Sequence, residues 1–176
     1  MRKVILYIAM SLDGYIAKED GDLSFLNTVA DPPEDYGYET FLATIDTVIM
    51  GRKTNDKVLS FGIEFPHRDK RCFVISRSRR GKDENVEYYN GGVNELIKEL
   101  KGAEGLDVFI DGGAELVFEL MKQDLIDRYI ISIIPVMLGG GIQLFKQGRP
   151  ENKLRLDKSM SFRSGLVQLW FDRIST

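Results

Sequence analysis

Residues 46–54 read Asp46-Thr47-Val48-Ile49-Met50-Gly51-Arg52-Lys53-Thr54, and this stretch contains the pattern that decides the fold. The run Thr47–Met50 is short, apolar and rich in β-branched residues, which is typical of a strand buried on both faces. Gly51 ends the run, and the segment Arg52–Leu59 that follows has no glycine or proline, so we expect it to be helical. A strand that passes through a glycine directly into a helix predicts one unit of a parallel α/β sheet.

The same alternation of apolar runs and helical periods continues on both sides of this unit. Strands are predicted at Val4–Met10, Thr47–Met50, Cys72–Ser76, Val86–Tyr89, Asp107–Ile110 and Arg128–Pro135, and helices at Tyr36–Ile45, Arg52–Leu59, Val93–Leu100 and Leu116–Met121. The tail differs, because Leu154–Phe162 and Leu166–Ile174 alternate and are joined by Arg163-Ser164-Gly165, a hairpin signal. We therefore predict one α/β domain over residues 1–176, with a mixed, mostly parallel sheet, helices on both faces and a C-terminal antiparallel hairpin.

Composition narrows the possible functions. The chain has 43% hydrophobic and 29% charged residues, which excludes a disordered or fibrous protein. Its net charge of -3 argues against a nucleic-acid or membrane-surface partner. The apolar runs are too short to span a membrane and the N-terminus lacks a signal-peptide pattern, so we expect a cytoplasmic protein.

The counts of cysteine and histidine limit the chemistry further. One cysteine, Cys72, and one histidine, His67, exclude a disulfide framework within the chain and argue against Ser-His-Asp chemistry and any metal site built from several Cys or His ligands. Cys72 starts a predicted core strand and is expected to be a small buried hydrophobe. His67 lies in a polar segment, and we expect it at the surface.

Two glycine turns are candidate anion sites. In open α/β sheets, ligands bind at the carboxyl ends of the parallel strands. Gly51-Arg52-Lys53-Thr54 and Gly112-Gly113-Ala114-Glu115 each follow a predicted strand and open a predicted helix, where glycine lets a ligand approach and free amides attract an anion. Two such turns would suit a pyrophosphate; the alternative is that the glycines are only a steric requirement of the turns. Neither turn has the GxGxxG pattern of a standard Rossmann site.

Two further segments carry chemistry at the same sheet edge. The strand that ends at Ser76 continues as Arg77-Ser78-Arg79-Arg80, and cations with hydroxyls at a strand end are able to read the 2′-phosphate of NADPH. The alternative is a solvated basic turn. Asp13 follows the first strand, and an apolar environment there would raise its pKa and make it a candidate acid. Its alternative role is that of a turn-forming Asp-Gly pair.

Taken in order, five segments resemble the dihydrofolate-reductase-like fold, and within it the C-terminal reductase domain of the riboflavin deaminase-reductases (the RibD C-terminal family). They are Ala9–Ile16, Asp46–Thr54, Phe73–Arg77, Ile110–Glu115 and Pro135–Gly141. The resemblance covers nearly the whole chain. It implies a three-layer fold and an NADPH-dependent reductase.

The resemblance also implies a role for individual residues. The turn on the pyrophosphate side of the cofactor matches Gly51, Arg52, Lys53 and Thr54, and the second glycine turn matches Gly112, Gly113, Ala114 and Glu115. The residues that recognise the 2′-phosphate match Ser76 and Arg77. The nicotinamide pocket matches Ala9 and Ile16. Asp13 matches a substrate-facing acid, and it, or a water that it orients, is the expected proton donor.

We therefore expect a reductase that transfers a hydride from NADPH to a pteridine-, pyrimidine- or imine-type small molecule, similar to 5-amino-6-(5-phosphoribosylamino)uracil reductase and dihydrofolate reductase. The chain starts three residues before its first strand, so we expect no preceding deaminase domain. The acidic segment Asp31–Asp35 stands where the riboflavin enzymes carry Ser and Arg, which argues against a phosphorylated pyrimidine.

Two other functions remain open from the sequence. One is a nucleotide-binding sensor or interaction module that has lost the reaction, with Phe25, Tyr36 and Tyr38 as its surface. The other is a flavin-binding redox protein, for which no segment specifically reads an isoalloxazine ring. The apolar segment Pro135–Phe145 predicts either a substrate lid or a dimer interface. Because members of the family that the chain resembles often pair, the resemblance implies a homodimer.

Overall fold

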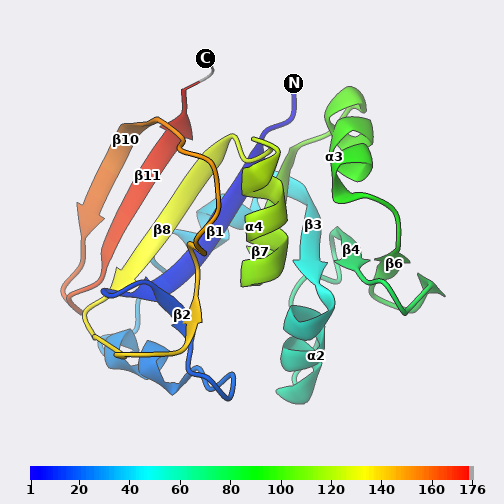
Figure 1. Cartoon of the computed structure of the whole chain (residues 1–176). Coiled ribbons are helices and arrows are strands. Elements are labelled where there is room, and N and C mark those ends of the chain that lie inside the picture. The colour runs from blue at the N-terminus through cyan, green and yellow to red at the C-terminus, as the bar shows by residue number, and fades with distance from the viewer. Residues whose placement is uncertain (175–176) are drawn as a thin grey trace.

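The computed structural model describes residues 1–174 and contains a nine-stranded sheet with helices packed on it (Figure 1). The strands are β1 (Val4–Ser11), β2 (Tyr15–Ala17), β3 (Ile45–Gly51), β4 (Arg71–Ile75), β5 (Gly81–Lys82), β6 (Glu87–Tyr89), β7 (Asp107–Gly112), β8 (Arg128–Ile134), β9 (Ile142–Gln143), β10 (Leu154–Ser161) and β11 (Val167–Arg173). The helices are α1 (Tyr38–Leu42), α2 (Arg52–Ser60), α3 (Val93–Gly102) and α4 (Ala114–Lys122), with a 3-10 helix η1 at Ser24–Val29.

The topology of the large sheet confirms the predicted fold class. Its strand order is β10-β11-β8-β1-β7-β3-β4-β6-β5. The central pairs β8–β1, β1–β7, β7–β3, β3–β4 and β4–β6 are parallel, whereas β10, β11 and β8 pair antiparallel, as does β5 with β6. The parallel strands therefore all end at one edge, the lower edge in Figure 1. The predicted C-terminal hairpin is present as β10–β11.

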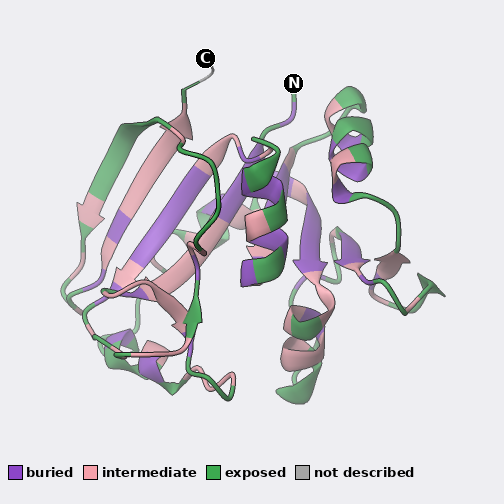
Figure 2. Cartoon of the chain, viewed as in Figure 1, coloured by how far each residue is buried: buried purple, intermediate pink, exposed green. Residues whose placement is uncertain are grey.

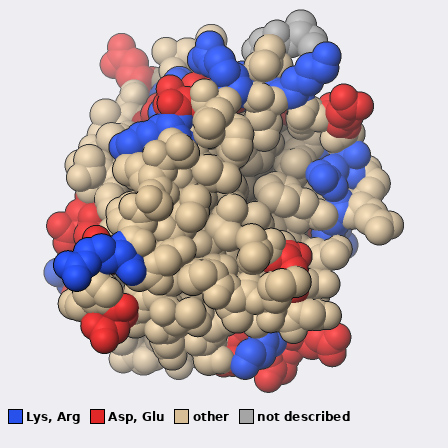
Figure 3. Space-filling model, turned by 90° about the vertical axis from the view of Figure 1, so that its left-hand side faces the viewer, with Lys and Arg blue, Asp and Glu red and all other residues tan. Residues whose placement is uncertain are grey.

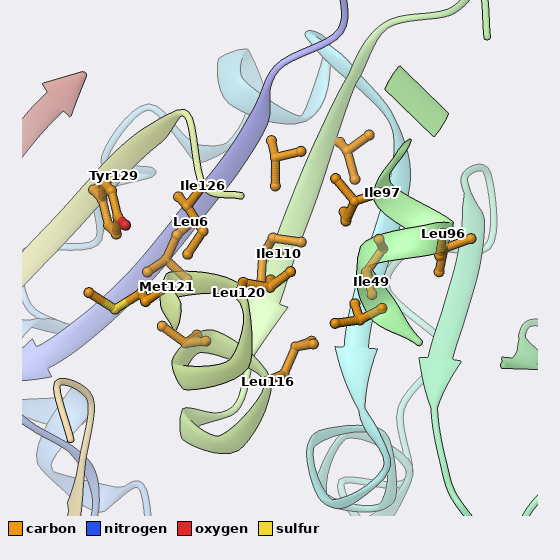
Figure 4. Close-up of a cluster of buried hydrophobic side chains, with 14 of the residues drawn as sticks. Leu6, Ile49, Leu96, Ile97, Ile110, Leu116, Leu120, Met121, Ile126 and Tyr129 are labelled. Atoms are coloured by element: carbon orange, nitrogen blue, oxygen red, sulfur yellow. The ribbon is translucent and has the colours of Figure 1, made fainter. Parts of the chain in front are cut away.

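Helices cover both faces of the sheet, which gives the three layers. On one face, α3 and α4 contribute Leu96, Ile97, Leu116 and Leu120 to a core with the inward side chains of β1, β3 and β7 (Figure 4). On the other face, Phe41 of α1 and residues of the 61–70 segment pack on the alternate side chains of the same strands. The central strands are consequently buried on both sides, while β10 is exposed (Figure 2).

Two local differences from the sequence-based prediction affect the ligand site. The helix expected over Tyr36–Ile45 is limited to α1, because Ile45 already belongs to β3. The short strands β2 and β9 were not predicted; they form a separate antiparallel pair, Tyr15 with Gln143 and Ala17 with Ile142. We call this pair the β2–β9 flap.

Two further findings concern the chain as far as Ile174. No helix there is long and apolar enough to cross a membrane. Cys72 is buried, as expected, with 3% of its surface exposed.

Candidate active site

One cleft of about 1860 Å³ lies at the edge where the parallel strands end. Its lining includes residues from β1, from the ends of β3, β4 and β7, and from the first turns of α2 and α4. Ile16 and Ala17 of β2 and Ile142 and Gln143 of β9 also line it, so the β2–β9 flap forms one of its walls. A single cleft thus joins segments that are far apart in the sequence.

The two glycine turns predicted from the sequence meet in this cleft. Gly51 is the N-cap of α2 and Gly113 the N-cap of α4. A Cβ atom placed on Gly51 would lie 3.6 Å from the backbone nitrogen of Gly113, and one placed on Gly113 would lie 3.2 Å from Oγ1 of Thr54. The amino ends of the two helices therefore face a common space, in which their unpaired amides attract an anion.

The residues expected in these turns are not all at the surface of the cleft. It is lined by Gly51, Arg52, Lys53, Thr54, Gly113, Ala114 and Glu115. Gly112 is instead buried behind the lining, with a φ of +107° that favours glycine. Gly112 thus shapes the turn, whereas its neighbours Gly113 and Ala114 line the cleft.

The basic segment after β4 borders the same cleft, which is lined by Ser76 and Arg77. Ser76 is buried, and its Oγ accepts hydrogen bonds from the backbone N–H groups of Arg79 (3.0 Å) and Ser78 (3.3 Å). The hydroxyl thus holds the turn in shape and leaves the side chain of Arg77 exposed.

The cations around the cleft differ in how far they are already paired. Asp56 binds Arg52 through Nη1 at 3.0 Å and Arg79 through Nη1 at 2.6 Å. Lys53 and Arg77 have no ion-pair partner among residues 1–174, and both are exposed. Lys57 also lines the cleft without an ion pair in the described residues, but it is half-buried, with Nζ 5.9 Å from the ring centroid of Phe61. Lys53 and Arg77 are therefore the exposed cations available to a ligand phosphate.

A third helix terminus faces the cleft, and the sequence analysis missed it. Gly92 is the N-cap of α3, and Gly91, Gly92, Val93 and Asn94 all line the cleft. The signal was present in the sequence, since a glycine pair precedes a helical period here as it does at Gly112-Gly113. The cleft therefore collects the amino ends of α2, α3 and α4.

The residues expected around a nicotinamide ring also line the cleft. Ala9 lies on β1, and Ile16 reaches the cleft from the β2–β9 flap. The flap is held to the loop after β1 by a hydrogen bond from the backbone N–H of Leu144 to the carbonyl of Gly14, at 3.0 Å. The binding roles of Ala9 and Ile16 remain predictions.

Asp13 has a different environment from the one expected. Its carboxylate accepts hydrogen bonds from the hydroxyl of Ser11 (2.5 Å) and from the backbone N–H groups of Gly139 (2.7 Å) and Leu138 (3.0 Å). The hydroxyl of Ser11, followed by these amides, lowers the pKa of Asp13, so the expected raised pKa is wrong. Asp13 is also absent from the cleft lining. Asp13 therefore links the loop after β1 to residues 138–139, and we call this contact the brace. A structural role of this kind is closer to the alternative prediction, a turn-forming Asp-Gly pair.

The end of the cleft beside α1 is aromatic and contains a carboxylate. Tyr7, Tyr38, Phe109 and Asp111 line it together. Burial raises the pKa of Tyr38, and the negative charge of Asp111 raises it further. Asp111 lies in the Asp-Gly-Gly sequence at the end of β7, but the sequence analysis assigned it no role.

His67 is not at the surface, contrary to expectation. Only 2% of the residue is exposed, because its ring packs edge-to-face on Phe109 and on Phe65. Its Nε2 lies 3.7 Å from Oδ2 of Asp111. The polar residues next to His67 gave no signal of this burial, which depends on Phe109 of β7 as well as on Phe65, two residues earlier in the chain.

The acidic segment 31–35 also lies away from the cleft. All five residues are exposed and none belongs to the lining. Asp35 accepts the backbone N–H of Glu39 at 3.0 Å, near the start of α1. The segment therefore does not contact a ligand in the cleft through its own side chains, although the charge of Asp35 contributes, after burial, to the raised pKa of the cleft residue Tyr7. The sequence-based argument against a phosphorylated pyrimidine stays a prediction.

Comparisons with known proteins give a consistent result. A family model described as the RibD C-terminal domain matches residues 2–168. The uncharacterized protein YwjB of Bacillus subtilis (strain 168) is 45% identical over 173 residues, which is 98% of this chain and 98% of that protein. The crystal structure of a putative riboflavin biosynthesis protein from Shewanella sp. PV-4 matches with a TM-score of 0.90 and 31% identity, over 98% of this chain and 99% of that one.

A more distant match has a larger chain. The diaminohydroxyphosphoribosylaminopyrimidine deaminase/5-amino-6-(5-phosphoribosylamino)uracil reductase of Thermotoga maritima matches with a TM-score of 0.72 and 17% identity. The match covers 98% of this chain and 57% of that one. At this identity the likeness is one of fold alone.

Proposed function

Because the chain belongs to the RibD C-terminal domain family, we propose that it is an NADPH-dependent reductase of a pteridine-, pyrimidine- or imine-type small molecule. The observation that carries the proposal is the single cleft in which three helix amino ends meet Lys53 and Arg77, two exposed cations with no ion-pair partner up to residue 174. The family description and the names of the structural neighbours, among them a riboflavin biosynthesis protein and a uracil reductase, support a reductase.

The residues present fit a phosphorylated dinucleotide. Gly51 and Gly113 leave the backbone open where a side chain would narrow the space between the two turns. The amides of Arg52 and Ala114 begin helices α2 and α4 and would hold the pyrophosphate. Arg77 would hold the 2′-phosphate, because a guanidinium forms charge-assisted hydrogen bonds with phosphate oxygens.

The size of the cleft supports a second ligand beside the dinucleotide. Small-molecule pockets typically have volumes of roughly 300–1,000 Å³, and this cleft is larger, at about 1860 Å³. The phosphate-binding groups gather at α2 and β4, whereas Tyr7, Tyr38 and Phe109 lie together at the end beside α1. A planar heterocyclic substrate would bind at this aromatic end.

The chain's own groups would bind, orient and supply a proton. When bound, NADPH supplies the hydride. Ala9 and Ile16 would form the apolar wall that orients the ring of the cofactor. A C=N reduction also needs a proton, and the groups of the aromatic end that are able to carry one are the phenols of Tyr7 and Tyr38, whose pKa values are raised by burial, and the carboxyl of Asp111.

The test is a calorimetric titration of the pure, folded protein with NADPH and NADH. We expect NADPH to bind more tightly; if neither binds, the proposal is wrong. NADPH oxidation would then be followed with a panel of pterins, folates, cyclic imines and pyrimidine ribitols, the latter with and without phosphate. Turnover of a panel compound supports the enzyme, whereas tight NADPH binding without turnover supports the nucleotide-binding sensor.

Replacing Arg77 tests the 2′-phosphate role directly. We expect Arg77→Ala to weaken NADPH binding by about 1.5–3 kcal/mol, the usual contribution of a hydrogen bond to a charged group, and to leave NADH nearly unchanged. The matched control is Arg163→Ala, which removes an exposed arginine outside the cleft lining. Equal losses for NADPH and NADH would remove Arg77 from this role.

We also propose that the protein forms a homodimer. Leu12, Met137 and Ile142 are exposed on and beside the β2–β9 flap. On the side of the molecule that faces the viewer in Figure 3, charged side chains lie mostly around the periphery and leave a broad uncharged area in the middle. Light scattering at micromolar concentration tests the proposal, and a monomeric mass would contradict it.

A further inference from the structure

Gln168 is a fully buried polar side chain on β11, and the sequence analysis assigned it no role. Its cross-strand partner on β8 is Ser132, and β1, which carries Tyr7, lies on the other side of β8 (Figure 1). Nε2 of Gln168 donates hydrogen bonds to Oη of Tyr7 (2.9 Å) and to Oγ of Ser132 (3.1 Å). A buried amide on β11 is thereby connected, across β8, to a residue that lines the cleft.

The orientation of this amide is fixed by Trp170. The Nε1–H group of Trp170 donates a hydrogen bond to Oε1 of Gln168 at 2.7 Å. An indole nitrogen is a donor only, so the amide oxygen must face it and the NH2 group must face Tyr7. The hydroxyl of Tyr7 is therefore an acceptor toward Gln168, and its own hydrogen needs a different acceptor.

That acceptor is the backbone carbonyl of Tyr36. Oη of Tyr7 donates a hydrogen bond to it at 3.2 Å, and Nε2 of Gln168 lies 3.3 Å from the same oxygen. The hydrogen bonds thus follow one direction, from the indole of Trp170 through Gln168 and Tyr7 to this carbonyl, and we call them the Gln168 relay. Because its hydrogen is committed to Tyr36, Tyr7 is unable to give it to a ligand without breaking the relay.

The relay ends at a strained turn. Tyr36 has a φ of +55°, a left-handed conformation that is uncommon for a bulky residue, and Gly37, the N-cap of α1, follows with a φ of +78°. The hydroxyl of Tyr36 is held as well, by the carbonyl of Val29 at 2.5 Å and by Oγ of Ser164 at 2.9 Å. A turn of this kind persists only where its surroundings hold it.

This turn directly precedes the second tyrosine of the aromatic end. Tyr38 is the first residue of α1 and lines the cleft together with Tyr7. The two rings pack edge-to-face, with their centroids 5.4 Å apart. The relay therefore acts on both rings, on Tyr7 through its hydroxyl and on Tyr38 through the backbone just before it.

We propose that Gln168 is a positioning residue of the substrate site, which through the relay holds Tyr7 and the turn before Tyr38 and thereby the aromatic wall on which a planar heterocycle binds. This inference rests on the proposed function, in which the aromatic end is the substrate end. It gives Tyr7 a binding role and not that of the proton donor, because the hydrogen of its hydroxyl is committed within the protein.

Amide hydrogen exchange, followed by NMR on ¹⁵N-labelled protein, tests the relay without a substrate. The backbone N–H groups of Tyr38 and Phe41 are each hydrogen-bonded at 3.0 Å within the turn or α1. We expect Tyr7→Phe, which keeps the ring and removes the hydroxyl, to reduce their protection by roughly 3- to 10-fold. Gln168→Met should reduce it at least as much, and Tyr7→Phe carries the test alone if the buried substitution prevents folding.

The same spectra contain two controls. Trp170 is the only tryptophan and gives a single indole N–H signal, which should stay protected in Tyr7→Phe and exchange faster in Gln168→Met, where its acceptor is lost. Tyr88→Phe is the matched control, since it removes a phenolic hydroxyl that binds Asp83 at 3.1 Å outside the cleft lining. It should leave the exchange of α1 unchanged.

The functional arm uses the panel compound that turns over. Tyr7→Phe and Gln168→Met should each raise its KM by about 3- to 10-fold. The kcat of both variants should stay within about twofold of the wild-type value, because a group that acts in binding alone leaves the chemical step unchanged. NADPH affinity should be unaffected in both. An unchanged KM would make the relay merely structural, and a fall in kcat alone in Tyr7→Phe would make Tyr7 the proton donor; either result contradicts the inference.

The outcomes separate the two proposals. Exchange rates of α1 equal to those of the wild type in both variants, or an unprotected indole of Trp170 in the wild type, would overturn the relay and leave the reductase standing. Failure of NADPH to bind the wild-type protein would overturn the proposed function. The exchange experiment would in that case still decide whether Gln168 holds the turn before α1.

Discussion

The two ends of the cleft are built in different ways. At the end that we propose binds phosphate (the phosphate end), the turns at Gly51 and Gly113 present backbone amides, and cations lie nearby; each group comes from one short segment at a strand end. At the aromatic end, Tyr7, Phe109 and Asp111 come from two strands, and a third segment contributes His67 behind them. The first end is a set of local turns, whereas the second is a product of tertiary packing.

This difference predicts how the two ends respond to substitution. The backbone amides of a local turn stay in position even when a distant contact is lost, since the shape of the turn follows from its own sequence. A packed site changes when any one of its segments moves, because its side chains hold one another in place. Substitutions at the flap and behind the aromatic end should therefore affect turnover more than dinucleotide binding.

The largest effect is expected at the flap. Gly141 has a φ of +137°, and a Cβ atom there would overlap the backbone carbonyl of Ala17. We expect Gly141→Ala to lower the free energy of unfolding by about 2–4 kcal/mol, from backbone strain and the clash together, as measured by urea denaturation. NADPH affinity should change far less than turnover.

Gly139 provides the matched control for this substitution. It also has a positive φ, +73°, but a Cβ atom would meet no atom within 4 Å. Gly139→Ala should therefore cost only the strain of the left-handed backbone, about 1–2 kcal/mol. Equal costs at Gly139 and Gly141 would mean that the contact between the two flap strands does not restrain the loop.

A smaller effect is expected at the phosphate end. Lys53 is exposed and has no ion-pair partner in the described residues, and it lies in the turn assigned to the pyrophosphate. Lys53→Ala should weaken NADPH and NADH by the same factor, about 3- to 10-fold, or ~0.5–1.5 kcal/mol. Calorimetric titration with both dinucleotides measures it.

Arg52 sharpens this prediction, because its guanidinium is already engaged by Asp56 at 3.0 Å. Arg52→Ala should therefore weaken the two dinucleotides less than Lys53→Ala does. A preference for NADH over NADPH in Lys53→Ala would instead assign Lys53 to the 2′-phosphate and contradict the separation of roles between Lys53 and Arg77.

The same contrast explains how much could be predicted from the sequence. The parallel sheet, its helices and the hairpin follow from local apolar patterns, and the structure confirms them. The turns at Gly51 and Gly113 were identified because strand, glycine and helix are adjacent in the chain. The turn at Gly92 has the same signal and could have been found in the same way.

The side-chain environments could not be predicted. After the nearby Ser11 hydroxyl, the amides that lower the pKa of Asp13 belong to Leu138 and Gly139, about 125 residues along the chain, and only the fold brings them to Asp13. His67 looked exposed because its own neighbours are polar, yet Phe65 and Phe109 bury it. Burial and hydrogen-bond partners are properties of the assembled fold, and a local pattern carries neither.

The brace formed by Asp13 should depend on pH. Its pKa is lowered in the folded protein, so the contact is fully present above the ordinary carboxyl value of about 4 and is lost as the pH falls through the lowered pKa. Asp13→Asn should reduce hydrogen-exchange protection of the Leu138 and Gly139 amides at neutral pH by roughly 3- to 10-fold. Protection in the variant should then not vary with pH in this range; a wild-type-like pH dependence would contradict the brace.

The smallest effect concerns Cys72, the only cysteine and a reporter of packing behind the aromatic end. Its thiol donates a hydrogen bond to the backbone carbonyl of His67 at 3.3 Å, and burial raises its pKa to about 12. At pH 8 the thiol should remain protonated and react with a thiol reagent only as fast as the protein opens. Asp111→Asn removes the second cause of the shift but not the burial, so the native protein should stay unreactive.

Phe65→Ala decides between packing and charge as the origin of this protection. It removes a buried ring beside His67 without changing any charge, and it should speed the reaction of Cys72 well beyond the rate in Asp111→Asn. Because the pKa of the thiol is raised on folding, this burial stabilises the protein below the unfolded thiol pKa and ceases to do so as the pH rises from about 9 towards 12. If Cys72 of the native protein reacts fast, the segment that carries His67 opens readily. The aromatic end would then depend on tertiary packing no more than the phosphate end does.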